Sequence, residues 1–453
     1  MNYVATDKQT MIDLNIQDGV YGERVLGSIY QNTDTKKGKR LMMHWIANPL
    51  SDIELICKRQ EAIAWGHLPE LPLNEEELDF LEYYLDYRER LSPKGAFLSF
   101  INKVDRIFKP ESSRYVITRG VALVVKLFVR LYDFRIHLPE NSPVLIKEFA
   151  GMVGASLSCS DLKKVLEEHA DGKAMSDYTI DRYDYLFRQE RLDIIRGLLD
   201  IVYQWDVLRT AHWLAVERNY CCRPIMTKEM RLSVSGFLHP FLQEGQKNDW
   251  SMSKGNVAIF TGSNMAGKST TLKALASIIW LAHCGLPVPV ESMICPVYEG
   301  LYTSINLPDS LRDGRSHFLA EVLRIKEVLL QARSGKRCLV VLDEMFRGTN
   351  AQDAFEASVA VNGLLIKYTS CHFLISTHIV EYARYFEQNP SCSFFYMESR
   401  IAGDHFICSH RLRTGISESR VGYWLVKKEL GCSPDVYDFS ANCNDIQQRN
   451  RQE

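Results

Sequence analysis

The chain has 453 residues, of which 46% are hydrophobic and 24% are charged. This balance is typical of a folded globular protein and excludes a mainly disordered chain, and the length favours two or three domains. Lysine plus arginine (54) nearly equals aspartate plus glutamate (56), so the net charge gives no argument for a nucleic-acid partner.

Targeting signals and cysteine pairs are not evident. No run of about 18 apolar residues predicts a transmembrane helix, and the first residues lack the basic start and apolar core of a secretory signal. None of the twelve cysteines falls in a C-x-x-C pair, so no zinc site is predicted. Several stand in apolar runs, as Cys338 does, which is typical of reduced core cysteines. We therefore expect a cytoplasmic protein without a membrane partner.

The first half of the chain is expected to be helical. The pattern predicts a helix over Lys39–Ile46, and apolar side chains recur at helical spacing over Glu75–Arg90. Gly120–Leu138 and Asp181–Arg209 are longer helix candidates. Because few strand patterns precede residue 225, residues 1–222 are predicted to form an elongated helical domain.

The second half changes character, since short β-branched runs alternate there with helical patterns. Strands and helices are predicted in turn at Val257–Phe260, Lys268–His283, Cys338–Leu342, Gln352–Lys367 and His372–Ile375. This order and spacing predict a parallel sheet flanked by helices. Residues 223–440 are thus predicted to form an α/β domain, followed by a polar tail over 441–453, so the fold class is α + α/β.

A glycine-rich loop follows the first of these strands. Gly262–Ser269 reads GSNMAGKS and fits the pattern G-x-x-x-x-G-K-[ST] between a predicted strand and a predicted helix. Glycines let successive N–H groups curl toward phosphate oxygens, and the helix N-terminus adds positive potential. Lys268 can reach the β- and γ-phosphates, and Ser269 can ligate magnesium. A chance glycine loop is the alternative, but strand, loop and helix together favour an ATP site.

Two further strand ends carry polar side chains. Asp343 and Glu344 follow a buried strand, where Asp343 would hold magnesium and Glu344 would polarise the attacking water. An acidic pair at a strand end is common, and only the phosphate loop upstream favours the catalytic interpretation. His378 follows the next strand and could sense the γ-phosphate or orient water, although a lone histidine is more often structural.

These segments together resemble the MutS family of DNA mismatch repair ATPases. TGSNMAGKST at Thr261–Thr270 is similar to the family's TGPNMGGKST, with Ser263 and Ala266 as departures. LDEMFRGTN at 342–350 is similar to LDEIGRGTS, and STH at 376–378 to ATH. His239–Pro240 and Asn248–Asp249 match the family's HP and ND, and DGRSHF at 313–318 resembles its G-x-S-T-F segment. Residues 33–63 resemble the start of the family's helical core.

The resemblance implies a helical core and lever domain followed by an ABC-type P-loop ATPase domain that uses ATP and Mg²⁺. It implies a homodimer formed through the ATPase domain, in which Ser316 reaches the nucleotide of the partner subunit and His410 contacts adenine. The residues assigned to nucleotide binding are Gly262, Ser263, Asn264, Met265, Ala266, Gly267, Lys268, Ser269, Thr270, Ser316 and His410. Magnesium is assigned to Ser269 and Asp343, and catalysis to Glu344 and His378.

The same resemblance makes DNA a plausible partner. The chain begins almost directly at the helical core, so we expect a short form without the family's mismatch-recognition and connector domains. The aromatic residue that precedes the Asn-Asp pair in the family is replaced by Gly245-Gln246-Lys247 here, so that adenine contact is expected to be lost.

Two other functions remain open. The first is a nucleotide-gated interaction protein with little turnover, which the intact Glu344 argues against. The second is another P-loop class, such as a transporter-type or chromosome-structuring ATPase. The sequence shows neither an LSGGQ-type signature nor long coiled-coil heptads, which makes this class the weaker alternative.

Overall fold

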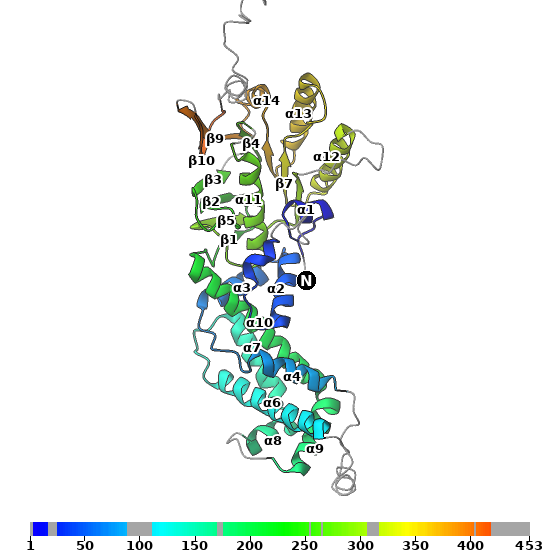
Figure 1. Ribbon diagram of the computed structural model, residues 1–453. Helices are drawn as coiled ribbons and strands as arrows, with labels where there is room; N and C mark the ends of the chain where they lie inside the picture. Colours follow the sequence, from blue (N-terminus) through cyan, green and yellow to red (C-terminus); the bar gives the residue numbers. More distant parts are fainter. Residues whose placement is uncertain are drawn as a thin grey trace, which may run out of the picture. The chain divides into compact units, whose positions relative to one another are not determined.

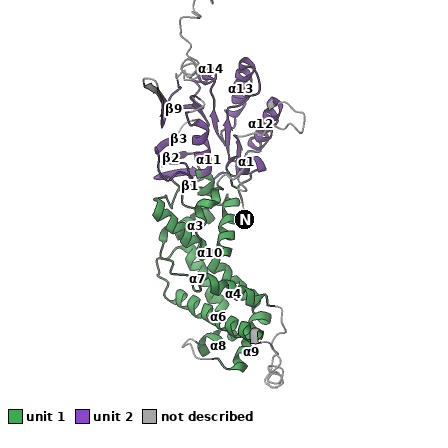
Figure 2. Cartoon of the chain, viewed as in Figure 1, with its two compact units in different colours: residues 1–4, 15–226, 278–289 green, residues 5–14, 227–277, 290–453 purple. Residues whose placement is uncertain are grey.

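The computed structural model describes residues 3–16, 25–87, 111–169, 175–252, 255–263, 266–305, 317–402 and 405–417. The chain divides into two compact units (Figure 2). Unit 1 contains residues 1–4, 15–226 and 278–289, and unit 2 contains residues 5–14, 227–277 and 290–453. None of the helices in the described part of the chain is both long and apolar enough to span a lipid bilayer.

Unit 1 is built from helices (Figure 1). They are the 3₁₀ helix η2 (Leu26–Tyr30), α2 (Lys36–Ala47), α3 (Ile53–Trp65), α4 (Glu75–Leu85), α6 (Glu111–Ile136), α7 (Val144–Leu157), α8 (Ser160–His169), α9 (Asp177–Tyr185), the π-helix η3 (Leu186–Glu190) and α10 (Leu192–Arg218). Helix α10 carries many of the buried apolar side chains and packs against α2, α3 and α7. The prediction of a helical first half is confirmed for the described residues.

Two of the predicted helix ranges need correction. The helix predicted over 120–138 begins earlier, at Glu111, because the more polar residues before Gly120 belong to the same helix. The single helix predicted over 181–209 is interrupted by η3, and α10 starts only at Leu192. A hydrophobic period alone cannot show such a break, because a π-turn changes the hydrogen-bond ladder and not the composition.

Close contacts with a buried carboxylate constrain the residues at the start of α2. Thr35 caps the helix by accepting the N–H of Gly38, and the buried carboxylate of Asp206 accepts the N–H groups of Asp34 and Thr35. A Cβ atom on Gly38 would lie 2.1 Å from Oδ2 of Asp206, so only glycine allows this close approach. Burial raises the pKa of Asp206, and its hydrogen bonds oppose that effect. This cluster pins α2 to α10.

The main sheet of unit 2 has six strands in the order β10-β9-β4-β8-β7-β6. They are β4 (Val257–Thr261), β6 (Gly300–Ser304), β7 (Cys338–Asp343), β8 (His372–Ser376), β9 (Cys392–Ala402) and β10 (His405–Thr414). Neighbouring strands from β9 to β6 are parallel, which confirms the predicted parallel core. Strand β10 pairs antiparallel with β9, so the sheet is mixed.

A second sheet of four strands was not predicted. It has the order β1-β5-β2-β3 and contains β1 (Ile225–Thr227), β2 (Leu232–Phe237), β3 (Asn248–Met252) and β5 (Ser292–Pro296). These strands are short, and two of them, β2 and β3, carry polar residues at alternate positions. Half-buried short strands give a weak sequence signal, in contrast to the continuous apolar runs of β4, β7 and β8.

The helices of unit 2 cover the main sheet. They are α1 (Lys8–Asp13), α11 (Lys268–His283), α12 (His317–Arg333), α13 (Ala351–Leu365) and α14 (Val380–Tyr385). The end of α11, from residue 278 on, belongs to unit 1. One apolar core combines side chains from β4, β7 and β8 with side chains from α12, α13 and α14. The predicted strand–helix alternation is therefore confirmed, and it places the carboxyl ends of β4, β8 and β7 next to one another.

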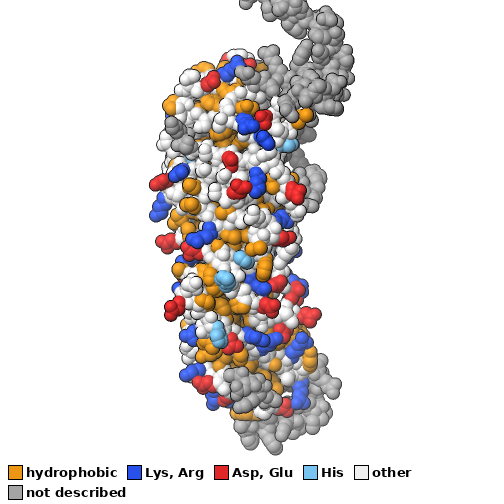
Figure 3. Space-filling view, turned by 90° about the vertical axis from the view of Figure 1, so that its left-hand side faces the viewer, with side chains coloured by type: hydrophobic (Ala, Val, Ile, Leu, Met, Phe, Trp, Pro, Cys, Tyr) orange, Lys and Arg blue, Asp and Glu red, His pale blue; other side chains and the backbone are white. Residues whose placement is uncertain are grey.

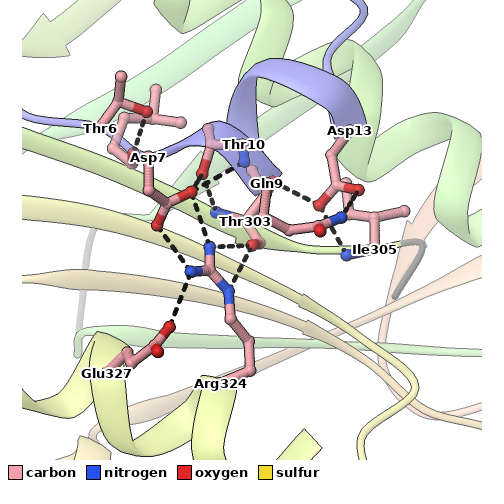
Figure 4. Close-up of polar contacts among 10 residues, drawn as sticks. Thr6, Asp7, Gln9, Thr10, Asp13, Thr303, Ile305, Arg324 and Glu327 are labelled. Carbon is pink, nitrogen blue, oxygen red and sulfur yellow. Dashed lines mark hydrogen bonds and ion pairs between the residues drawn. The ribbon is translucent and has the colours of Figure 1, made fainter. Parts of the chain in front are cut away.

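Residues 5–14 pack in unit 2, although the sequence boundary places them in the helical domain. Ala5 pairs with Gly300 at the edge of the main sheet, and α1 follows directly. Asp13 accepts hydrogen bonds from Thr303 Oγ1 (2.7 Å) and from the N–H of Ile305 (2.9 Å) (Figure 4). The N-terminal segment thus adds to the edge strand β6 from a distant part of the chain.

Asp7 joins this segment to α12. Its carboxylate caps α1 through Thr10 and accepts two hydrogen bonds from the Arg324 guanidinium, at 2.7 and 3.0 Å (Figure 4). The Arg324 side chain is 8% exposed and also donates to the carbonyl of Thr303. The pKa of Asp7 is lowered because these hydrogen bonds and the positive charge outweigh its partial burial.

We expect Asp7→Ala to destabilise unit 2. The change removes a helix cap and leaves the buried Arg324 guanidinium with only the more distant carboxylate of Glu327, so the free energy of unfolding should fall by about 2–4 kcal/mol. Denaturant unfolding measures it, with Lys8→Ala as the control because Lys8 is exposed on the same helix. A loss within about 0.5 kcal/mol of the control, the usual range of a surface substitution, would contradict a structural role for this ion pair.

Candidate active site

The polar residues predicted from three strand ends lie at one edge of the main sheet. Strand β8 lies between β4 and β7, and Asp343 is the register partner of Ser376. The loop after β4, the acids after β7 and the histidine after β8 therefore share one edge of unit 2. Strands β8, β7 and β6 lie on one side of β4, and β9 and β10 lie on its other side. Open α/β sheets bind ligands at such a point, where the strand order switches from one side to the other.

The loop between β4 and α11 has the backbone that a phosphate cradle needs. Gly262 and Gly267 have φ angles of 135° and 94°, which L side chains rarely adopt. The hydroxyl of Ser263 is buried without a hydrogen-bond partner in the described structure, so it can serve a ligand. Ala266 is fully buried. Asn264 and Met265 lie outside the described residues.

Lys268 is the first residue of α11, and its side chain is 2% exposed. Its ammonium group donates to the carbonyls of Gly262 (2.6 Å) and Ser263 (3.0 Å) and lies 3.3 Å from Oε1 of Glu344. Burial lowers the pKa of Lys268, and the Glu344 carboxylate opposes that effect. The structure thus brings together the lysine of the loop and the predicted catalytic acid.

Asp343 is buried at the end of β7. Its carboxylate accepts a hydrogen bond from the Ser376 hydroxyl and lies 3.3 Å from Nη2 of Arg347. The same Ser376 oxygen accepts the N–H of Glu344 at 3.0 Å. One serine at the end of β8 therefore contacts the carboxylate of Asp343 and the backbone of Glu344.

Glu344 is surrounded by positively charged or protonatable groups. Oε2 lies 3.0 Å from Nε of Arg347 and 3.7 Å from Nδ1 of His378, and Oε1 faces Lys268. Interaction with the His378 ring, followed by the charges of Lys268 and Arg347, lowers the pKa of Glu344 to about 2. Glu344 is therefore ionised at neutral pH. The His378 side chain itself is 51% exposed.

The backbone after β7 is strained at two positions. Glu344 has φ 48° and Phe346 has φ 65°, both in the left-handed region. A residue with a Cβ atom costs about 1–2 kcal/mol there, and a bulky one is uncommon. The family pattern LDEIGRGTS has glycine at the position of Phe346, so this chain places an aromatic ring where glycine would be unstrained.

His410 lies beside the phosphate loop. Strand β10 bulges between Cys408 and Leu412, His410 has φ 53°, and its carbonyl accepts a hydrogen bond from Asn248. A Cβ atom on Gly267 would lie 3.7 Å from Nδ1 of His410. Ser269 is partly buried and Thr270 is exposed on α11, whereas Ser316 lies outside the described residues.

Sequence reasoning missed three residues of this site. Ser376 stood inside the quoted STH motif but was given no role, although strand register pairs it with Asp343. Arg347 bridges both acids, and Phe346 shapes the loop that carries them. The signal for Arg347 was its helical spacing of three and four residues from Glu344 and Asp343. For Phe346, the departure from glycine was the signal.

The residues present fit a magnesium nucleotide. Two glycine backbones, an unpartnered hydroxyl and a lysine line the loop, and the Ser269 hydroxyl and Asp343 carboxylate are oxygen donors of the kind that magnesium prefers. Among the described residues, no group of three or more His, Cys, Asp or Glu side chains could hold a metal ion alone. Magnesium typically takes one or two protein oxygens together with substrate phosphates, which matches this donor set.

Comparisons with known proteins point the same way. A family model described as MutS domain V matches residues 258–436. DNA mismatch repair protein MutS of Thermotoga maritima is 31% identical over 514 aligned residues, covering 94% of this chain and 64% of that protein. MutS of Thermotoga sp. strain RQ2 is 30% identical with the same coverage. DNA mismatch repair protein MSH7 of Arabidopsis thaliana is 25% identical over 95% of this chain and 42% of its own length. The chain thus spans 42% to 64% of the length of these relatives.

Proposed function

Because the chain belongs to the MutS family, we propose that it is a magnesium-dependent ATPase that hydrolyses ATP at a dimer interface and acts on DNA. The convergence of Lys268, Glu344 and His378 beside Asp343 carries this proposal. We assign the ATPase domain to residues 223–440 together with the segment 5–14, and the helical core and lever to the rest of residues 1–222.

Each residue of the site has a chemical role in this proposal. The loop Gly262–Thr270 and Lys268 bind the phosphates, and Ser269 and Asp343 hold magnesium, which would neutralise phosphate charge. Glu344 accepts a proton from the attacking water and His378 helps to orient it. Arg347 keeps the two carboxylates in place, and Ser376 holds the carboxylate of Asp343 and the backbone of Glu344.

Dimerisation and DNA binding rest on the family. Ser316 would contact the nucleotide of the partner subunit, and His410 would contact adenine next to Gly267. For DNA, the described residues on the face in Figure 3 show lysine and arginine side chains interspersed with acidic ones rather than one broad basic patch. We therefore expect DNA contact through a few phosphates, with an affinity that falls only moderately as salt rises, since the salt dependence scales with the number of phosphates contacted. A cytoplasmic location accords with this function.

ATP binding is the first step to test. ATP that binds only the folded protein should raise the free energy of unfolding by about 2.7 kcal/mol at 100 times its dissociation constant. A thermal melt with excess ATP and magnesium measures the shift, with adenosine as the control ligand that lacks phosphates. An unchanged melting temperature would contradict the nucleotide site.

A phosphate-release assay then distinguishes an ATPase from the second candidate function. A nucleotide-gated interaction protein with little turnover is the second candidate, because the carboxylate of Glu344 is paired with Lys268 and Arg347 and would have to exchange these contacts to accept a proton. Tight ATP binding without steady-state phosphate release would support that second function. Release that depends on magnesium would support the ATPase.

A further inference from the structure

The segment between Glu344 and Arg347 contains an aromatic residue in a backbone conformation that favours glycine. Phe346 has φ 65°, and its side chain is only 3% exposed. Such a conformation persists in a bulky residue only where the surrounding packing determines it. The packing of the ring therefore shows what holds the loop.

The ring of Phe346 packs against α12 and α13. It forms a buried cluster with Ile325 of α12 and Ala354 of α13. Its centroid lies 5.4 Å from that of Phe318, in the first turn of α12, with the ring planes tilted by 45°. Burial of the ring in this cluster offsets the strain of the backbone.

The residues on either side of Phe346 contribute to the active site instead. Glu344 contacts Lys268 and lies near His378, and Arg347 contacts both Glu344 and Asp343. The loop 344–347 is thus anchored in the core by Phe346, and Glu344 and Arg347 on either side of this anchor belong to the site. A movement of α12 that carries Phe318 would be transmitted to Glu344 through Phe346.

We propose that Phe346 is a positioning residue that couples helix α12 to the carboxylate of Glu344. This role rests on the proposed ATPase function. The family pattern LDEIGRGTS has glycine at this position, and glycine cannot make the ring contact that Phe346 makes here. The anchor acts on the hydrolysis step and leaves ATP binding to the loop Gly262–Thr270.

The test compares two substitutions. Phe346→Gly relaxes the backbone and removes the ring, so kcat should fall about 10- to 100-fold while the Kd for ATP changes less than twofold. Phe346→Leu keeps an apolar side chain in the cluster and should retain kcat within about threefold of wild type. Equal kcat for Phe346→Gly and wild type would overturn the proposal. Thermal melts establish that both variants are folded.

A double-mutant cycle tests the contact with α12. Phe318→Ala should lower kcat through the same path, so its effect in the Phe346→Gly background should nearly vanish. A purely structural role would lower the melting temperature with additive effects on kcat, and that result would also overturn the coupling.

Hydrogen exchange provides a measurement that does not need turnover. The N–H of Glu344 donates to the Ser376 carbonyl at 3.1 Å and to its hydroxyl. Phe346→Gly should accelerate exchange of this amide well beyond the amides of β7, whereas Phe346→Leu should not. If the wild-type protein does not hydrolyse ATP, the proposed function fails. If Phe346→Gly leaves exchange of the Glu344 amide unchanged, the positioning role of Phe346 is rejected independently.

Discussion

Glu344→Gln is expected to stop ATP hydrolysis while nucleotide binding persists. Glutamine keeps the shape of the side chain but cannot accept the proton of the attacking water. General-base catalysis contributes roughly 10²- to 10⁴-fold, so kcat should fall by that factor. Lys268 and the glycine loop are unchanged, and the Kd for ATP should stay close to that of wild type.

The pKa of Glu344 sharpens this expectation. The value of about 2 means that its carboxylate is charged at every pH used for an assay near neutrality. The wild-type carboxylate is thus already ionised under assay conditions, so a loss of activity in the variant reports the missing base. Glu387→Gln is a matched control, because Glu387 is exposed in the same unit. Turnover in Glu344→Gln equal to that of the control would rule out Glu344 as the base.

The same variant tests the composite site. If hydrolysis releases the dimer, Glu344→Gln with saturating ATP and magnesium should accumulate as a dimer in sedimentation velocity. A monomer under these conditions, with bound ATP demonstrated, would contradict a dimer closed by nucleotide.

Lys268→Met is expected to weaken ATP binding strongly. The substitution keeps the apolar stem of a side chain that is 2% exposed and removes its positive charge. A hydrogen bond to a charged group contributes about 1.5–3 kcal/mol, which corresponds to roughly a 10- to 150-fold increase in Kd. Fluorescent-nucleotide titration or calorimetry measures this change.

Folding must be separated from binding in this experiment. Lys268 also bonds the carbonyls of Gly262 and Ser263, so its loss could loosen the loop. Melting curves without nucleotide report that effect, and Lys367→Ala is the control because Lys367 is exposed in the turn that follows α13. A folded Lys268→Met variant that binds ATP as wild type does would refute the phosphate site.

Local features of the site could be predicted from the sequence alone. The strand before Gly262, the helix that begins at Lys268 and the buried strand that ends at Asp343 all match their predicted ranges closely. These elements are marked by contiguous patterns: an apolar run, a glycine pair at fixed spacing and a helix of apolar period. The adjacency of their ends follows from the rule that parallel strands align their carboxyl ends at one edge.

Other features had little or no local signal. The four-stranded sheet consists of short, half-buried strands, and η3 breaks a helix that the hydrophobic period continued through. The role of Ser376 depends on which strand lies beside β7, and that order cannot be derived from the spacing along the chain. His410 comes next to Gly267 only because β10 bulges on an added edge strand.

The chemistry proposed for the glycine-rich loop therefore rests on neighbouring residues, whose types form a pattern within nine positions. The surroundings of that loop were decided by tertiary structure. Asp13 and Ile305 are 292 positions apart, and Asp7 and Arg324 are 317 apart, yet each pair is joined by hydrogen bonds. Such contacts depend on strand order and on which surfaces bury each other, and these emerge only when the whole chain packs. The same packing holds the ring of Phe346 against α12 and so determines where Glu344 stands.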